Sequence, residues 1–211
     1  NDIKRSSRLL ENSYAETKVC YNTPESVLVP AGHFNSSVAA ALVNAAYGEI
    51  PHARIHVENL NVQPGIVNVY RSDMQWQELL NMHFRVMNKR HLFSRLIELN
   101  ANDRLNVIFY KNEMVVVAAV NGQLQLIRNF DRASDADAIY CLLNLCKQSG
   151  IDPSATAVSI SGFIDKDSQL FVWLDKYFME VKPDMADENL FNDELKQYPL
   201  HYFTPFFKLL S

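Results

Sequence analysis

Apolar and polar residues alternate most regularly in the middle of the chain, where the pattern predicts three consecutive antiparallel strands. Residues 104–111 alternate with the period of two that a strand requires. Residues 114–120 form a continuous valine-rich apolar run, which is typical of a strand buried on both faces. Asn121-Gly122 then predicts a tight hairpin turn, and residues 123–130 alternate again. Because such a meander is marginal alone, we expect helices to cover one of its faces.

After this meander the apolar residues recur at helical spacing. Ser134 is a suitable N-cap and Gly150 a suitable end for the predicted helix. Its apolar stripe consists of Ile139, Leu142, Leu143 and Cys146. A short strand over residues 156–160, a second helix over 168–178 and a last strand over 179–182 follow. Helices that connect strands of one sheet predict an α/β architecture.

Strands and helices also alternate in the first hundred residues, in a looser pattern. The predicted strands are residues 17–21, 26–29, 53–57, 65–70 and 84–87. The predicted helices are residues 4–14, 36–46, a segment after the N-cap Asp73 that includes residues 76–83, and residues 90–99. We therefore expect two halves, residues 1–100 and residues 101–211.

Composition and charge disfavour several classes of function. The 211 residues are 48% apolar and carry a formal net charge of −4, with a pI near 5.9. The basic cluster at residues 85–91 is too short for a phosphate-binding stripe, so we expect a solvated helix start there and no nucleic acid partner. No apolar run approaches the roughly 18 residues of a membrane span.

The cysteines indicate the compartment. Cys20, Cys141 and Cys146 have no metal-binding or redox spacing. The first residues show no apolar region of a secretory leader, and a leader before this segment stays open because the segment can begin inside a longer natural chain. We therefore expect buried free thiols in a reducing environment and a cytoplasmic location.

Two histidines and a glutamate suggest a metal site, which their local pattern disfavours. His52, His56 and Glu58 alternate with apolar residues after Pro51, as on a strand. On a strand the two histidines share a face but lie roughly 13 Å apart, at about 3.3 Å per residue. We therefore expect a solvated strand face here and no metal.

Two acidic residues follow the predicted strand that ends near Gly162. Asp165 and Asp167 lie where ligands bind in open α/β sheets, beyond the carboxyl ends of strands. The alternative is a polar loop that caps the next helix, and we favour it because neither acid has an evident partner.

The end of the chain changes character after Pro183. Its acidic residues are Asp184, Asp187, Glu188, Asp193 and Glu194. Residues 198–210 are strongly apolar and aromatic, so we expect this tail to dock on the body of the protein or on a partner.

With these elements placed, the sequence resembles an uncharacterised bacterial family, a domain of unknown function with an actin-like ATPase fold of the ribonuclease H-like class. The resemblance covers most of the chain. It rests on residues 26–30 with Phe34, on the meander of residues 105–130, on residues 138–140 with 142–143 and 147–148, on residues 158–162, and on the aromatic C-terminus. It implies mixed sheets, with a three-strand antiparallel meander flanked by helices, in two related halves. The strand meander that usually opens the first half is not recognisable, so either that half is truncated or those strands lie outside this segment.

The actin-like superfamily binds ATP in a cleft between its halves, and the resemblance implies where the nucleotide would lie. An Asp and glycines normally occupy the hairpin between the first two strands of the second half, whereas this chain has Lys111-Asn112-Glu113. Of a glycine pair at the adenosine site, Gly162 alone is kept. If nucleotide binds, Gly162 and Asp165 would lie near it, with Glu113 as an acid.

Two functions follow from these observations. The first is a non-catalytic actin-like module that binds or scaffolds an unknown protein partner and needs no cofactor. The alternative is an ATP-dependent enzyme, a kinase or an ATPase, with an atypical site for ATP and Mg²⁺. No serine-nucleophile, Walker-type or dinucleotide-binding motif occurs in the sequence.

Overall fold

The computed structural model describes residues 12–62, 64–99, 105–120 and 122–210. The chain divides into two compact units, Asn1–Glu98 and Leu99–Ser211, which we call unit 1 and unit 2. Within the described residues, no helix combines the length and the apolar character needed to cross a membrane.

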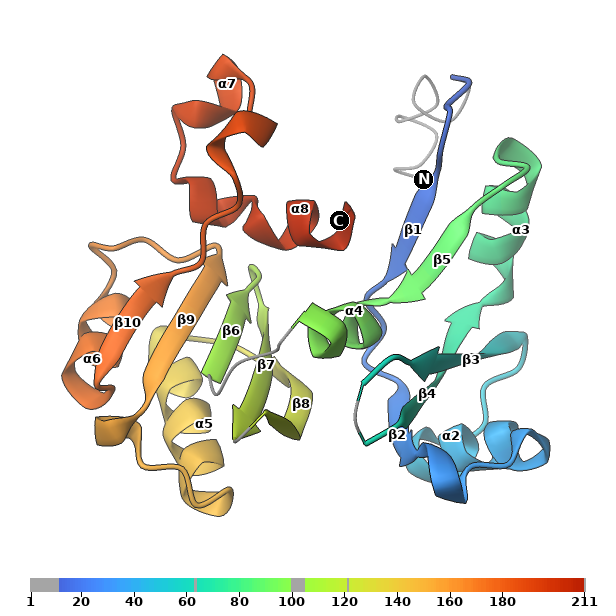
Figure 1. The fold of residues 1–211 in the computed structure, drawn as a ribbon, viewed down its shortest axis with the longest axis horizontal. Helices are drawn as coiled ribbons and strands as arrows, with labels where there is room; N and C mark the ends of the chain where they lie inside the picture. The colour runs from blue at the N-terminus through green and yellow to red at the C-terminus, as the bar shows by residue number, and fades with distance from the viewer. Residues whose placement is uncertain (1–11, 63, 100–104, 121, 211) are drawn as a thin grey trace. The chain divides into compact units, whose positions relative to one another are not determined.

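Unit 2 contains a five-stranded sheet in the order β10-β9-β6-β7-β8 (Figure 1). The strands are β6 (Leu105–Phe109), β7 (Glu113–Val120), β8 (Gln123–Asp131), β9 (Ala157–Gly162) and β10 (Glu180–Pro183). Strands β6, β7 and β8 are antiparallel neighbours, whereas β9 pairs in parallel with both β6 and β10. The predicted meander is confirmed, and the predicted strands after it join the same sheet.

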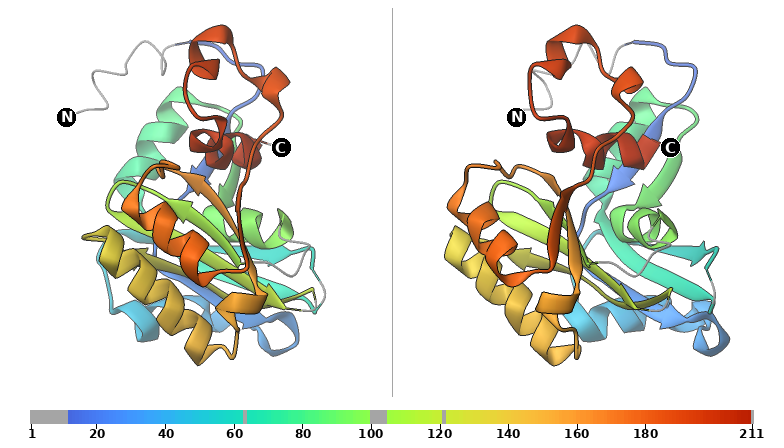
Figure 2. Two further views of the ribbon diagram at one scale, coloured as in Figure 1. Left: turned by 90° about the vertical axis from the view of Figure 1, so that its left-hand side faces the viewer. Right: turned by 60° about the vertical axis from the view of Figure 1, so that its left-hand side comes forward.

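The core of unit 2 lies between this sheet and two helices, α5 (Asp135–Gln148) and α6 (Gln169–Tyr177). The two helices pack against each other and lie on one face of the sheet (Figure 2). Six consecutive residues of β7, from position 114 to 119, are buried, as the continuous apolar run predicts. The predicted N-cap of α5 is confirmed, because the backbone N–H of Asp137 donates to the side chain of Ser134 at 3.1 Å.

The C-terminal tail of unit 2 packs on the body of the same unit. Its helices are η5 (Glu188–Leu190), α7 (Asp193–Lys196), η6 (Leu200–Tyr202) and α8 (Thr204–Leu210). His201 and Thr204 are buried, and both η6 and α8 contact β9 of the body. Within the tail, the Phe191 ring lies against Phe207 with centroids 4.6 Å apart. The tail therefore docks on the body of the protein, which is one of the two alternatives expected from the sequence.

Unit 1 contains two small sheets. β1 (Lys18–Tyr21) pairs in parallel with β5 (Asn88–His91), and β4 (Ile66–Asp73) lies between β2 (Ser26–Pro30) and β3 (Ala53–Leu60) in an antiparallel sheet. The helices are α2 (Ala39–Tyr47), α3 (Met74–His83) and α4 (Leu92–Leu99). A small core of α2 and β4 residues holds the second sheet. Asp73 caps α3 as predicted, since its carboxylate accepts from the Gln75 N–H at 2.6 Å.

Three expectations for unit 1 need correction or fall outside the structure. The strand expected over residues 84–87 lies instead at Asn88–His91, where it pairs with β1. The following helix begins at Leu92 and not at residue 90. The helix expected over residues 4–14 lies mostly outside the described residues, and residues 12–14 are not helical.

Candidate functional site

The strand register brings two of the three predicted site residues to one edge of the unit 2 sheet. Phe109 at the end of β6 is aligned with Gly162 at the end of β9 and with Met114 near the start of β7. Glu113, one residue before Met114, therefore lies at the same edge. Asp165 follows Gly162 by three residues in the loop that leads to α6. Ligands bind at such carboxyl edges in open α/β sheets, so this edge is the candidate site.

Gly162 has no room for a side chain. Its φ is +80°, and a Cβ atom built on it would lie 2.1 Å from the carbonyl oxygen of Phe109. The same carbonyl accepts a hydrogen bond from the Phe163 N–H at 2.7 Å. The close approach of β6 to the end of β9 is therefore sufficient to require a glycine at this position.

Glu113 lies in a short hairpin that is closed by backbone hydrogen bonds. The Tyr110 N–H donates to the Glu113 carbonyl at 2.8 Å, and the Arg132 N–H donates to the Asn112 carbonyl at 2.7 Å. The Glu113 carboxylate accepts from the side-chain amide of Asn129 at 2.7 Å. The Tyr110 N–H, the Asn112 carbonyl and the Glu113 carboxylate are therefore already hydrogen-bonded within the sheet and its hairpin.

Asp165 is held by the tail and by the start of α6. Its carboxylate accepts a hydrogen bond from the Tyr202 hydroxyl, which raises the pKa of Tyr202 to about 12. Its carbonyl accepts from the Ser168 hydroxyl at 2.7 Å. Ser168 is itself the N-cap of α6, because its side chain accepts from the Phe171 N–H at 3.2 Å. The polar-loop interpretation of Asp165 and Asp167 fits this geometry, with Ser168 as the cap.

An open hollow of about 780 Å³ lies beside Asp165, between the loop before α6 and the C-terminal tail. It is lined by Asp165, Lys166, Asp167, Ser168, Pro183, Met185, Pro199, Leu200 and His201. We call it the unit 2 hollow. His201 fixes the tail side of it, since its Nε2 donates to the Ile164 carbonyl at 2.7 Å. The tail contribution was missed at the sequence level, because the contacts join residues 37 positions apart.

The strand face expected to be solvated in unit 1 is partly covered at His56 and Glu58, which corrects the prediction for these two residues. His56 is stacked on Tyr70 with ring centroids 4.8 Å apart, and its Nε2 lies 2.7 Å from the Ser72 hydroxyl. The Tyr70 hydroxyl donates to the Glu58 carboxylate at 2.6 Å. His52, in the turn before β3, and Arg54 on the same face are exposed. Among the described residues, no group of three His, Cys, Asp or Glu side chains could hold a metal ion.

His91 at the end of β5 is fully buried among these rings. Its Nδ1 accepts from the Phe93 N–H at 3.1 Å, and its Nε2 lies 3.0 Å from the Thr23 carbonyl. One ring nitrogen accepts and the other donates, which is the pattern of a neutral imidazole. Burial accordingly lowers the pKa of His91 to about 4, and burial together with the positive charge of Arg54 lowers the pKa of His56 to about 4.

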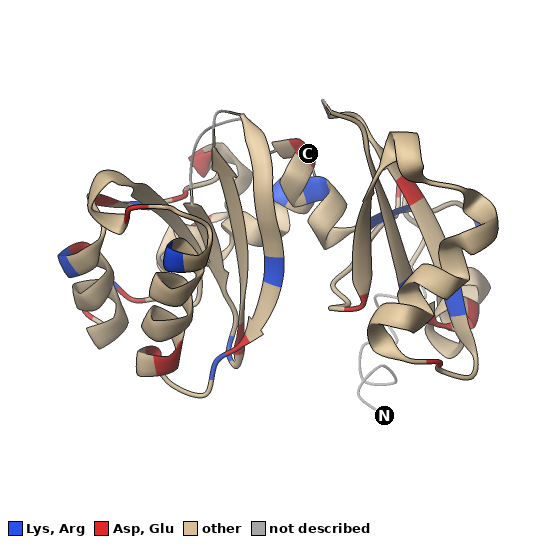
Figure 3. Cartoon of the chain, turned by 90° about the horizontal axis from the view of Figure 1, so that it is seen from below, with Lys and Arg blue, Asp and Glu red and all other residues tan. Residues whose placement is uncertain are grey.

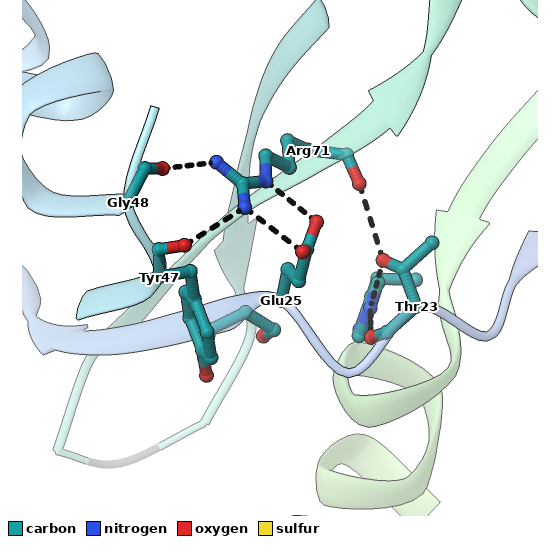
Figure 4. Close-up of polar contacts among 7 residues, drawn as sticks. Thr23, Glu25, Tyr47, Gly48 and Arg71 are labelled. Atoms are coloured by element: carbon teal, nitrogen blue, oxygen red, sulfur yellow. Dashed lines mark hydrogen bonds and ion pairs between the residues drawn. The ribbon is translucent and has the colours of Figure 1, made fainter. Parts of the chain in front are cut away.

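A buried arginine ties three segments of unit 1 together (Figure 4). The Arg71 side chain is 2% exposed and forms two hydrogen bonds with the Glu25 carboxylate, at 2.5 and 2.8 Å. It also donates to the carbonyl oxygens of Gly48 at 2.6 Å and Tyr47 at 3.3 Å. A charged residue inside an apolar strand was the sequence signal, but its partner lies 46 residues away.

The basic cluster of residues 85–91 is not a solvated helix start, which corrects that prediction. Residues 88–91 form β5, and Arg90 pairs with Glu98 at 2.6 Å. The Lys89 ammonium donates to the Gln77 side chain at 2.8 Å. In Figure 3 the basic residues of the described chain lie scattered among acidic ones and form no continuous stripe.

Comparisons with known proteins identify the family and the fold. The sequence profile of the family described as "Protein of unknown function (DUF3822)" matches residues 1–181. None of the curated proteins matches the chain.

Two solved structures resemble the chain over most of its length. A crystal structure from Bacteroides thetaiotaomicron, of a protein with actin-like ATPase fold and unknown function, aligns with a TM-score of 0.75 and 19% identity, over 93% of this chain and 77% of the other. A chain of the PilM-PilN type IV pilus biogenesis complex aligns with a TM-score of 0.56 and 14% identity, over 98% of this chain and 82% of the other. The predicted actin-like ATPase fold is thus confirmed.

Proposed function

The chain belongs to the family of unknown function DUF3822 and has an actin-like ATPase fold, and from this premise we propose that it is a protein-binding module that does not hydrolyse ATP. A fold does not confer an activity, so the argument rests on the candidate site. The proposal includes a cytoplasmic location, which the three free cysteines support because thiols persist in reducing compartments.

The observation that carries the proposal is the hairpin between β6 and β7. A phosphate-binding loop needs backbone N–H groups that point at the phosphate, and glycines let the backbone approach it. This hairpin has no glycine, and the Tyr110 N–H is already bonded to Glu113. Gly162, which resembles half of an adenosine-binding glycine pair, is required by its approach to Phe109. Neither feature needs a nucleotide to account for it.

A protein partner is supported by a structural neighbour. PilM shares the fold and occurs with PilN in a type IV pilus biogenesis complex. That likeness concerns the fold, so it supports protein binding as a use of this architecture and specifies no partner for this chain.

One observation favours the alternative, an ATP-dependent enzyme. The unit 2 hollow lies beside Asp165, beyond the carboxyl end of β9, where ligands bind in α/β sheets. In that case Asp165 and Gly162 would lie near the nucleotide, with Mg²⁺ and Glu113 as the acid. The lining carries two acids, Asp165 and Asp167, against one lysine, Lys166. This excess of negative charge disfavours phosphates unless a cation binds with them, which makes this the weaker alternative.

Thermal unfolding with and without Mg-ATP separates the two functions. A nucleotide at a hundred times its dissociation constant would add about 2.7 kcal/mol to the free energy of unfolding. We expect no shift of the melting temperature at millimolar Mg-ATP. A rise that is absent with magnesium chloride alone would support the enzyme and contradict the proposal.

A further inference from the structure

We propose that the unit 2 hollow is the docking site for a segment of another protein that carries a large apolar side chain beside lysine or arginine. This inference deepens the proposed function and rests on it, because it assigns the protein-binding surface and the chemistry of the partner.

The walls of the hollow are fixed without a ligand. The Asp184 N–H donates to the Ile160 carbonyl at 2.7 Å, which anchors the start of the tail to β9. His201 anchors the opposite wall through Ile164, and Tyr202 is bonded to Asp165. A site that is already formed loses little entropy when a partner binds, so this hollow is suited to recognition.

The tail side of the hollow offers apolar surface. Met185 is 59% exposed and stands with Pro183, Pro199 and Leu200 along the lining. A methionine adapts its shape to different apolar side chains, and exposed methionine is common at binding surfaces. A large apolar side chain that enters the hollow would cover this surface.

The charge around the hollow is negative. Asp165 and Asp167 line it with one lysine, Lys166, and residues 183–197 of the adjoining tail contain five acidic residues and one lysine. One of these acids, Asp184, is paired with Lys208, but the others leave an excess of negative charge. Lysine or arginine beside the apolar anchor would complement this charge and speed the encounter.

The hollow can be tested with synthetic peptides and the full 211-residue chain. The probe is a short fluorescent peptide with one tryptophan flanked by arginines, and its binding is followed by fluorescence anisotropy. Two matched peptides replace the arginines by glutamates or the tryptophan by serine. We expect saturable binding of the first peptide that weakens with added salt, and at least about tenfold weaker binding of the other two.

Four exposed positions provide the variants and their matched controls. Met185→Asp and Asp167→Lys alter the hollow, whereas Met179→Asp, at a residue with the same 59% exposure, and Asp175→Lys on α6 alter surface outside its lining. We expect each hollow variant to lower the affinity for the arginine-tryptophan peptide about tenfold, and each control to change that affinity less than about twofold. Circular dichroism verifies that the four variants are folded.

Three results would overturn the inference. One is equal binding of the arginine and glutamate peptides, and another is equal affinity of the hollow variants and their controls. The third is self-association of the chain that Met185→Asp abolishes while no peptide binds, since the occupant would then be a second copy. Stabilisation by Mg-ATP would instead contradict the proposed function, so the two failures are distinguishable.

Discussion

The backbone of Gly162 passes so close to that of Phe109 that a Cβ atom on the glycine would lie 2.1 Å from the phenylalanine carbonyl oxygen. This contact joins the ends of β9 and β6 at the candidate site. Gly162 therefore has a structural role in the sheet, whether or not a ligand binds at that edge.

The contact predicts a large difference between two glycine substitutions in unit 2. Gly150 has φ +67° and no atom within 4 Å of a built Cβ, so Gly150→Ala should cost only the strain of a left-handed alanine, about 1–2 kcal/mol. Gly162→Ala carries the same strain and also forces two strands apart, so we expect it to lower the free energy of unfolding by about 4 kcal/mol or more.

Urea unfolding of both glycine variants measures this difference. The chain has two tryptophans, and Trp173 packs against the core of unit 2 while Trp76 lies on α3 of unit 1. In a Trp76→Phe background the fluorescence of Trp173 therefore reports unit 2. Equal losses of stability in the two glycine variants would show that the close contact is not needed.

Acid should destabilise unit 1 between pH 6.5 and about 4. The pKa of His56 and of His91 is lowered from 6.5 to about 4, in both cases first by burial. In the unfolded chain these rings take up protons below pH 6.5, whereas in the folded unit they do so only near 4. The unfolded state binds more protons in this interval, so the free energy of unfolding falls as the pH is lowered from 6.5 to 4.

In this interval each histidine should lower the free energy of unfolding by up to about 1.4 kcal/mol per pH unit. Urea unfolding at a series of pH values, followed by Trp76 fluorescence in a Trp173→Phe background, measures the slope. His56→Gln should make the free energy of unfolding depend less steeply on pH, and we expect the same of His91→Asn. A stability of unit 1 that is constant between these pH values would contradict the buried neutral histidines.

Removing the charge of Glu25 should lower the free energy of unfolding of unit 1 more than removing the charge of an exposed glutamate does. Arg71 is buried, and it donates two hydrogen bonds to the Glu25 carboxylate, which compensates its charge. We expect Glu25→Gln to cost about 1.5–3 kcal/mol, the range for hydrogen bonds to charged groups. Glu16→Gln is the control, because Glu16 is 65% exposed and lies 3.9 Å from Lys18, a surface pair worth less than about 1 kcal/mol.

The effect of Glu25→Gln should also depend on pH. The hydrogen bond from Arg71 lowers the pKa of Glu25 below its ordinary 4.5. The stability that this carboxylate contributes is therefore complete above pH 4.5 and is lost as the pH falls through the lowered value. Urea titrations of the wild type and the variant should converge in acid, and a gap that persists there would argue against an ionic contribution.

Local signals in the sequence predicted much of the secondary structure. The predicted caps Asp73 and Ser134 each bond to a backbone N–H group two or three residues on, so the local sequence contains both partners. The valine run of β7 and the alternation of β8 likewise report burial directly.

Contacts between distant segments could not be predicted in this way. Alternation placed His56 and Glu58 on one face of β3, but it could not show that Tyr70 and His91 would cover that face. The four polar residues of β5 are too few to reveal a period, and their strand depends on pairing with β1. The site is similar, since the sequence supplied Gly162 and Asp165 but not their partners Phe109 and Tyr202.

We propose that this actin-like chain lacks a working nucleotide site, and isothermal titration of Mg-ATP into the chain measures nucleotide binding itself. The hairpin of residues 110–113 and the enclosed Gly162 predict no saturable heat up to millimolar nucleotide. A saturable isotherm with one nucleotide per chain, weakened by substitution of Asp165, would contradict the account.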